Sequence, residues 1–197
     1  MNGKIKSLED YASKNNIPII QAEGLEFIIS KIKKHNIKNI LEIGSAIGYS
    51  AIMMALIRED IKVTTVERDK DRYNEAIKNI KNFDLEDRIT IYNVDAFDYN
   101  DNNKYDLIFI DAAKGQYIKF FEKFKFNLND KGMIVTDNLK FHGMVGHTDK
   151  IKNRNTKQLV KKIEKYIEFL QNNEEYKTEF YDIGDGISIS KKYSNDK

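Results

Sequence analysis

The sequence predicts an α/β fold in which helices cover both faces of a mostly parallel sheet. Short apolar runs rich in β-branched residues alternate with segments of helical periodicity along most of the 197 residues. This alternation is typical of βαβ units with right-handed crossovers. Two further runs close the chain on either side of an Asp-Gly turn, which predicts a C-terminal antiparallel hairpin and seven strands in all.

The elements follow in order along the chain. An N-terminal helix is expected from the apolar face formed by Leu25, Ile28 and Ile32, before the first strand. The expected strands are 39–43, 62–66, 89–92, 106–110 and 133–136, and the helices between them are 50–57, 71–82 and 116–126. A last helix carries an apolar stripe over 159–170, with Asn155 or Thr156 as its expected N-cap, and the hairpin strands are 177–181 and 187–191.

We expect one domain over residues 1–197, because no linker, repeat or low-complexity stretch interrupts the pattern. Residues 1–35 would form a helical cap and 138–155 a basic loop. The absence of cysteine excludes disulfides, thiolate metal sites and a cysteine nucleophile, and fits a cytoplasmic location. The longest apolar run, 51–57, is far shorter than the ~20 residues of a membrane span, so no membrane partner is expected.

Positive charge is concentrated in one part of the chain. The net charge is +2, but residues 138–165 contain eight Lys or Arg and two acidic residues, so this segment carries +6 and the remainder −4. Such a segment fits either a solvated Lys-rich face or a binding site for a polyanion.

A glycine-rich turn, Leu-Glu-Ile-Gly-Ser-Ala-Ile-Gly-Tyr-Ser, follows the first strand. A dinucleotide site would need glycine at Ala46 and Tyr49, and a phosphate-binding P-loop would need lysine after Gly48. The turn fits neither pattern. It has an acid (Glu42), a glycine (Gly44) and, after three further residues, a second glycine (Gly48), an arrangement used by S-adenosylmethionine-dependent methyltransferases. A turn without any ligand is the alternative.

The residues at the ends of two further strands are suited to binding a nucleoside. Glu67 ends the second strand, 23 positions after Gly44, where a carboxylate can accept both hydroxyls of a ribose. Asp95 and Ala96 follow the third strand, where an adenine edge would lie. A solvent-exposed Glu67 is the alternative.

The fourth and fifth strands end in Asp111 and in Asp137-Asn138. Because parallel strands open onto the same edge of a sheet, these side chains can converge. Two carboxylates and one amide oxygen form a hard oxygen site that suits Mg²⁺ or Ca²⁺ better than zinc. The alternative is that both aspartates only terminate strands.

Segments 41–50, 109–117, 137–145 and 184–190 resemble the metal-dependent class I O-methyltransferases related to catechol and caffeoyl-CoA O-methyltransferases. Within this family the similarity is greatest to the bacterial tRNA 5-hydroxyuridine methyltransferases, and it extends from Tyr11 over nearly the whole chain. The resemblance implies the Rossmann-like fold of class I S-adenosylmethionine methyltransferases and a homodimer.

The resemblance also implies roles for individual residues. Together with Glu42 and Gly44 of the turn, the expected S-adenosylmethionine contacts are Ile20, Ser50, Glu67, Asp95, Ala96 and Asp111. Asp111, Asp137 and Asn138 would hold Mg²⁺ or another divalent cation, and Lys114 matches the lysine proposed as general base in the catechol relatives. The sequence departs from the subfamily at Ile20, where methionine is usual, and at Val94, where glycine is usual.

This chemistry leaves the acceptor open. Transfer of a methyl group is an in-line displacement, and a metal can align two adjacent acceptor oxygens and lower the pKa of the reacting one. Both catechol and 5-hydroxyuridine, with its C4 carbonyl, offer such a pair. Lys114 is either the base that takes the proton or a surface lysine.

The basic loop favours tRNA, whose anticodon loop carries the 5-hydroxyuridine at the wobble position. Lys140, Lys150, Lys152 and Arg154 would contact phosphates, and Tyr117 and Phe141 would either stack on a base or pack in the pocket wall. The enzyme alternative is O-methylation of a small catechol or a hydroxycinnamoyl-CoA. The non-enzymatic alternative is an RNA-binding or cofactor-sensing protein on the same fold.

Overall fold

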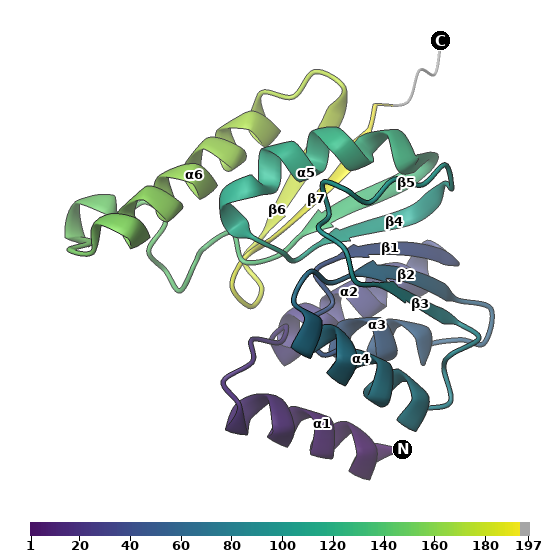
Figure 1. The fold of residues 1–197 in the computed structure, drawn as a ribbon. Helices are drawn as coiled ribbons and strands as arrows, with labels where there is room; N and C mark the ends of the chain where they lie inside the picture. Colours follow the sequence, from purple (N-terminus) through teal and green to yellow (C-terminus); the bar gives the residue numbers. More distant parts are fainter. Residues whose placement is uncertain (194–197) are drawn as a thin grey trace.

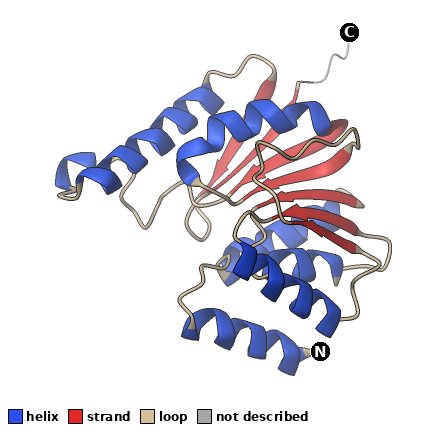
Figure 2. Cartoon of the chain, viewed as in Figure 1, coloured by secondary structure: helices blue, strands red, loops and turns tan. Residues whose placement is uncertain are grey.

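A computed structural model describes residues 1–193 and confirms the predicted fold class. Strands form a central layer and helices flank it on both sides (Figure 2). The helices are α1 (Asn2–Lys14), α2 (Ala22–Lys34), α3 (Tyr49–Ala55), α4 (Lys70–Asn82), α5 (Tyr117–Phe124) and α6 (Arg154–Gln171). The strands are β1 (Asn39–Ile43), β2 (Lys62–Val66), β3 (Ile89–Tyr92), β4 (Tyr105–Ile110), β5 (Leu128–Thr136), β6 (Tyr176–Tyr181) and β7 (Ile187–Lys192).

The order of the strands, β3-β2-β1-β4-β5-β7-β6, places a topological switch in the middle of the sheet. Strands β2 and β3 lie on one side of β1, and the chain then crosses to the other side of β1, where β4 and β5 follow. Strands β1 to β5 are parallel, while β7 pairs antiparallel with both β5 and β6. In sheets of this kind, ligands bind at the carboxyl ends of the strands beside the switch, here β1 and β4.

Each face of the sheet is buried by its own set of helices (Figure 1). Helices α2 to α4 pack one face, with Ile28, Ile32 and Ile52 fully buried, and α5 and α6 pack the other through Phe121 and Tyr166. Helix α1 lies outside the first set, where Lys4 donates to the Asn82 carbonyl and Glu9 accepts the Tyr49 hydroxyl. Helix α5 is flanked by the short 3₁₀ turns η1 (Lys114–Gln116) and η2 (Lys125–Asn127). Over residues 1–193, no helix is long and apolar enough to cross a membrane.

Two local expectations need correction. Strand β5 begins at Leu128 rather than Met133, and its pairing with β4 shifts register between Tyr105 and Leu107, an irregularity that the apolar pattern did not reveal. The N-cap of α6 is Asn153, whose side-chain oxygen accepts the Thr156 backbone N–H at 3.0 Å. The prediction of Asn155 or Thr156 was wrong because the helix starts earlier, at Arg154, where the extended backbone of the preceding residue ends.

Candidate active site

The carboxyl edge of the sheet contains a cavity of about 630 Å³. It is lined by the residues that follow β1 to β5 and by the segment between α1 and α2. Nine of the residues expected in a site line it: Ile20, Gly44, Ser50, Glu67, Asp95, Ala96, Asp111, Lys114 and Asn138. The structure therefore brings together residues that are distributed over more than half of the chain.

The glycine-rich turn holds β1 and β4 close together. Gly44 has φ +99°, and a Cβ at this position would collide with the backbone carbonyl oxygen of Asp111. The N–H groups of Gly44 and Ser45 both donate to the carbonyl of Val66 at 3.1 Å, which ties the turn to the end of β2. Glycine is thus required at position 44 by both backbone conformation and space.

Glu67 is fixed by the backbone around it. Although only 7% exposed, it lines the cavity, and its two carboxylate oxygens accept N–H groups from Ala46 at 2.9 Å and from Asp69 at 2.8 Å. Each oxygen keeps a second lone pair for a ligand. This arrangement suits a pair of ribose hydroxyls.

Glu42 lies deeper than expected, beneath the cavity. It is fully buried, and its carboxylate accepts hydrogen bonds from the hydroxyls of Ser50 and Thr65, the latter at 2.5 Å. Burial raises the pKa of Glu42 to about 7, against the effect of these hydrogen bonds. Glu42 therefore supports Ser50, which lines the cavity, from below.

The end of the cavity near Asp95 is more aromatic than the sequence indicated. Asp95 accepts the Phe97 N–H at 2.9 Å and lies 3.7 Å from the Arg68 guanidinium. The ring of Phe97 stacks on that of Phe120 with centroids 4.8 Å apart, and both rings line the cavity. Phe97 directly follows the Asp95-Ala96 pair, but Phe120 comes from α5, so sequence reasoning did not connect them.

Ser45 is a further residue that the sequence reasoning missed. Ser45 lines the cavity, and its buried hydroxyl has no hydrogen-bond partner within residues 1–193. A buried hydroxyl without a partner is costly, so this group is available to a polar atom of a ligand. Its position next to Gly44 was the only signal in the sequence.

Asp111, Asp137 and Asn138 meet at the ends of β4 and β5. The Asn138 side-chain amide donates to Asp111 at 2.9 Å, and its backbone N–H donates to the Asp137 carboxylate at 2.7 Å. Burial, and secondly the negative charge of Asp111, raises the pKa of Asp137 to about 7. Burial also raises the pKa of Asp111, while Lys114 opposes the shift.

These three residues fit a hard divalent cation. The carboxylates of the buried Asp137 and the half-buried Asp111 repel each other and would be stabilised by a positive ion, and oxygen ligands are those that Mg²⁺ prefers. Across residues 1–193, no cluster of three or more His, Asp or Glu side chains forms a potential metal site. The set therefore depends on the Asn138 amide as its third ligand.

Lys114 and two aromatic residues border this trio. Lys114 begins η1, is half-buried, and its ammonium lies 6.0 Å from the centre of the half-buried Phe141 ring. Tyr117 is 1% exposed, donates its hydroxyl to the Asp137 carbonyl at 3.0 Å and packs on Tyr166. Tyr117 is thus buried behind the cavity lining and is not free to stack on a base.

The basic loop divides into paired and unpaired cations. Lys140 forms an ion pair with Asp182 in the hairpin turn. Lys150, Lys152 and Arg154 are exposed, and none has an ion-pair partner in the described part of the chain. Three of the four predicted phosphate contacts therefore remain available.

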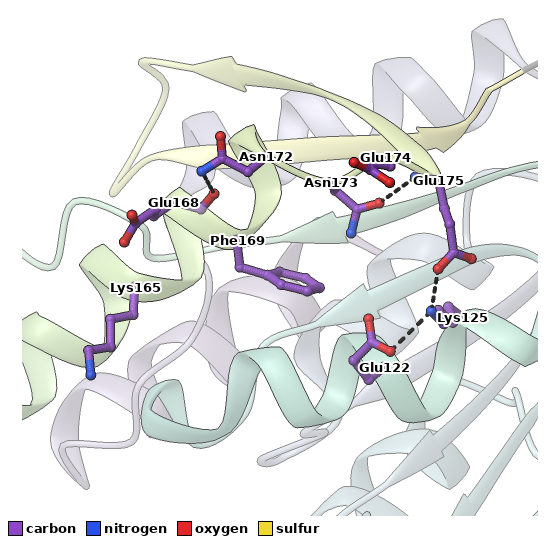
Figure 3. Close-up of a pocket in the computed structure, with 9 residues that line it drawn as sticks. All are labelled: Glu122, Lys125, Lys165, Glu168, Phe169, Asn172, Asn173, Glu174 and Glu175. Carbon is purple, nitrogen blue, oxygen red and sulfur yellow. Dashed lines mark hydrogen bonds and ion pairs between the residues drawn. The ribbon is translucent and has the colours of Figure 1, made fainter.

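A second hollow, of about 540 Å³, lies between α5, α6 and the start of β6 (Figure 3). Its central cation, Lys125, contacts the carboxylates of Glu122 at 3.0 Å and Glu175 at 2.8 Å. None of the expected site residues lines this hollow, and its Lys125 is already paired with acids. The cavity at the carboxyl edge is therefore the candidate active site.

Known proteins are similar to this chain in sequence and in fold. A caffeoyl-CoA O-methyltransferase of Medicago sativa is 29% identical over 152 residues, covering 72% of this chain and 62% of that enzyme. A flavonoid 3',5'-methyltransferase of Vitis vinifera is 27% identical over 192 residues, covering 92% and 80%. The chain spans less than two thirds of the length of the caffeoyl-CoA relatives from Medicago sativa and Arabidopsis thaliana.

Among solved structures, a Staphylococcus aureus protein provisionally named caffeoyl-CoA O-methyltransferase is 40% identical, with a TM-score of 0.92 over 96% of this chain and 92% of that one. A Bacillus cereus O-methyltransferase in complex with S-adenosylhomocysteine shares the fold, with a TM-score of 0.82 at 21% identity, over 97% and 91% of the two chains. The sequence profile described as O-methyltransferase matches residues 4–193. This chain belongs to the O-methyltransferase family.

Proposed function

We propose that the protein transfers the methyl group of S-adenosylmethionine to the 5-hydroxyl of 5-hydroxyuridine at the wobble position of tRNA, giving 5-methoxyuridine. Membership of the O-methyltransferase family supports the reaction class. The cavity supports the cofactor: Glu67 offers a fixed carboxylate to the ribose, and the Phe97 and Phe120 rings offer an apolar wall to the adenine.

The other end of the cavity supplies the groups for methyl transfer. Asp111, Asp137 and Asn138 would hold Mg²⁺, which when bound lowers the pKa of the acceptor hydroxyl and fixes its orientation. Lys114, next to this trio, would accept the proton of the hydroxyl at Nζ from its neutral amine form and become an ammonium. The Asp111 side chain, between the cofactor cavity and the metal ligands, orients both reactants.

One observation carries the choice of tRNA: three exposed cations without ion-pair partners follow the acceptor side of the site. Lys150, Lys152 and Arg154 belong to the segment that begins at Asn138, which lines the cavity. An RNA loop brings several phosphates together, and each contact with Lys or Arg adds affinity through counterion release. Phe141, half-buried beside Lys114, is the ring that could stack on the target base.

A small catechol-like acceptor is the second candidate. The Medicago sativa relative is named for caffeoyl-CoA, and the same three oxygen ligands would serve a pair of adjacent hydroxyls. The exposed cations of the basic loop have no evident purpose for an uncharged catechol. They would suit the phosphates of a CoA thioester, but an RNA loop presents more phosphates to them, which is why we place the small-molecule acceptor second.

The proposal is tested by nucleoside mass spectrometry. tRNA containing 5-hydroxyuridine is incubated with the protein, isotope-labelled S-adenosylmethionine and Mg²⁺, then digested and analysed. We expect labelled 5-methoxyuridine with the wild type and at least about 100-fold less with Asp137→Asn, because the variant replaces a charged metal ligand by a neutral one. Unmodified 5-hydroxyuridine under conditions in which a catechol is methylated would refute the tRNA assignment.

Asp137→Asn also distinguishes a role of this residue in metal binding from a role in stabilising the fold. The substitution removes a buried carboxylate whose pKa is raised, so the apo variant should be at least as stable as the wild type at pH 8. Mg²⁺ should raise the melting temperature of the wild type but not of the variant. Equal stabilisation of both proteins by Mg²⁺ would place the metal elsewhere.

A further inference from the structure

The turn between β6 and β7 holds the loop that follows β5 by several contacts (Figure 1). The carbonyls of Asp185 and Gly186 accept the N–H groups of Lys140 at 2.7 Å and Leu139 at 2.9 Å. The Asp185 carboxylate accepts the N–H of His142 at 2.6 Å. One short turn thus determines the path of the chain immediately after Asn138.

Asp185 is placed unusually for an aspartate in a turn. It is only 6% exposed, and its second carboxylate oxygen has no hydrogen-bond partner within residues 1–193. The His142 imidazole Nδ1 lies 3.9 Å from this oxygen. A turn aspartate normally faces water, so burial of this side chain against the loop indicates a specific role.

The loop that Asp185 contacts has a backbone conformation that few residues adopt. Phe141, His142 and Gly143 are consecutive residues with φ of +46°, +56° and +74°, and Asn138 has φ +66°. Side chains other than glycine disfavour this left-handed region, so such a run persists only where surrounding contacts hold it. The Asp185 carboxylate supplies a contact in the middle of the run, at His142.

We propose that Asp185 is a positioning residue for the acceptor side of the active site. By holding the His142 backbone, it keeps residues 141–143 in the left-handed conformation, and so maintains the loop path that presents Asn138 to the cavity and Phe141 to Lys114. Asp185 is not among the residues that line the cavity, so it acts through the loop alone. The inference rests on the proposed function in one respect, namely that this loop borders the part of the site that binds the methyl acceptor.

Amide hydrogen exchange of the full-length protein, with and without S-adenosylhomocysteine, tests the proposal. In Asp185→Ala, amides of residues 139–146 should exchange about tenfold faster or more, with little change in the rest of the sheet. Asp182→Ala is the matched control, because it lies in the same turn and contacts the same loop, but through an exposed ion pair with Lys140. It should leave the exchange rates unchanged.

Kinetics and the conservative variant complete the test. For Asp185→Ala we expect S-adenosylhomocysteine affinity within about twofold of wild type, and kcat/KM for the acceptor lower by about 10- to 100-fold. Asp185→Asn keeps an oxygen for the His142 N–H and should restore slow exchange and most activity. If the amides of the loop exchange at the same rate in Asp185→Ala as in the wild type, the proposal is overturned, whichever acceptor the enzyme uses. If only the tRNA assignment fails, the expected change in exchange rate is unaffected.

Discussion

At the scale of single residues, Gly44 determines how closely the first and fourth strands approach. Its positive φ and the nearby Asp111 carbonyl leave no room for a side chain. Because Asp111 is expected to contact both cofactor and metal, the absence of a side chain at position 44 also sets where this carboxylate can lie.

Gly44→Ala should therefore lower both stability and cofactor affinity. We expect a loss of at least about 2 kcal/mol in the free energy of unfolding, since the substitution combines backbone strain with a collision. Urea denaturation and calorimetric titration with S-adenosylhomocysteine measure the two effects. Gly3→Ala is the control, because nothing lies within 4 Å of a Cβ there; a similar loss in both variants would contradict the account.

Glu42 should make stability depend on pH. Its pKa in the folded protein is raised from 4.5 to about 7 by burial, so the folded state binds the proton more tightly than the unfolded state. The stability that the neutral carboxyl contributes is fully present below pH 4.5 and is lost as pH rises through about 7. The expected loss is about 3 kcal/mol at most.

The comparison of wild type with Glu42→Gln isolates this effect. A glutamine is always neutral, and Asp111 and Asp137, whose pKa values are also raised, are present in both proteins. Urea denaturation between pH 5 and 8 should show the stability of the wild type falling relative to that of the variant. Parallel pH profiles would mean that Glu42 does not titrate in this range.

At the scale of secondary structure, the N-terminus of α6 offers a direct test of local sequence reasoning. Asn153 caps the helix, while Asn155 lies within its first turn. Asn153→Ala should cost about 1 kcal/mol in the free energy of unfolding. Asn155→Ala should be neutral or slightly stabilising, because alanine favours helix more than asparagine does. The reverse order of stabilities would refute the assignment of the cap.

The sequence predicted those elements whose signal is local and periodic. Buried strands such as β1 and β4 appear as short apolar runs, and the Asp-Gly turn indicated the hairpin. The cap of α6 was mislocated because two asparagines and a threonine occur within four residues, each able to cap a helix. Choosing among them requires the path of the preceding loop, which is a tertiary property.

The site was predictable to the extent that it depends on strand ends. Parallel topology alone brings Gly44, Glu67, Asp95 and Asp111 to one edge of the sheet. How deeply a side chain is buried was not predictable. Glu42 and Tyr117 have suitable chemistry and spacing, yet both are buried behind the cavity lining. The same limit applies to Phe120 and Asp185, whose contacts come from distant parts of the chain.

At the scale of the whole molecule, charge separation explains how a nearly neutral protein can bind a polyanion. The net charge of +2 combines a +6 segment over 138–165 with a remainder of −4. Attraction to RNA would therefore act mainly on the face that carries the acceptor site, which favours productive orientation during encounter.

Replacing Lys150, Lys152 and Arg154 by glutamine should weaken tRNA binding and reduce its salt dependence. Each lost phosphate contact lowers the slope of log affinity against log salt by roughly 0.7 to 0.9. Filter binding over a range of salt concentrations measures this slope. Glutamine at Lys6, Lys14 and Lys33, exposed on α1 and α2, is the charge-matched control. Equal slopes for the two triple variants would move the RNA surface elsewhere.

A competition assay between two acceptors identifies the one that the enzyme methylates. The protein is given equal concentrations of 5-hydroxyuridine-containing tRNA and caffeoyl-CoA, with labelled S-adenosylmethionine and Mg²⁺, and the label in each product is counted. We expect most of the label to enter tRNA as 5-methoxyuridine, and the triple glutamine variant of the basic loop to place less label in tRNA than the wild type does. Label that enters caffeoyl-CoA and not tRNA would refute the assignment.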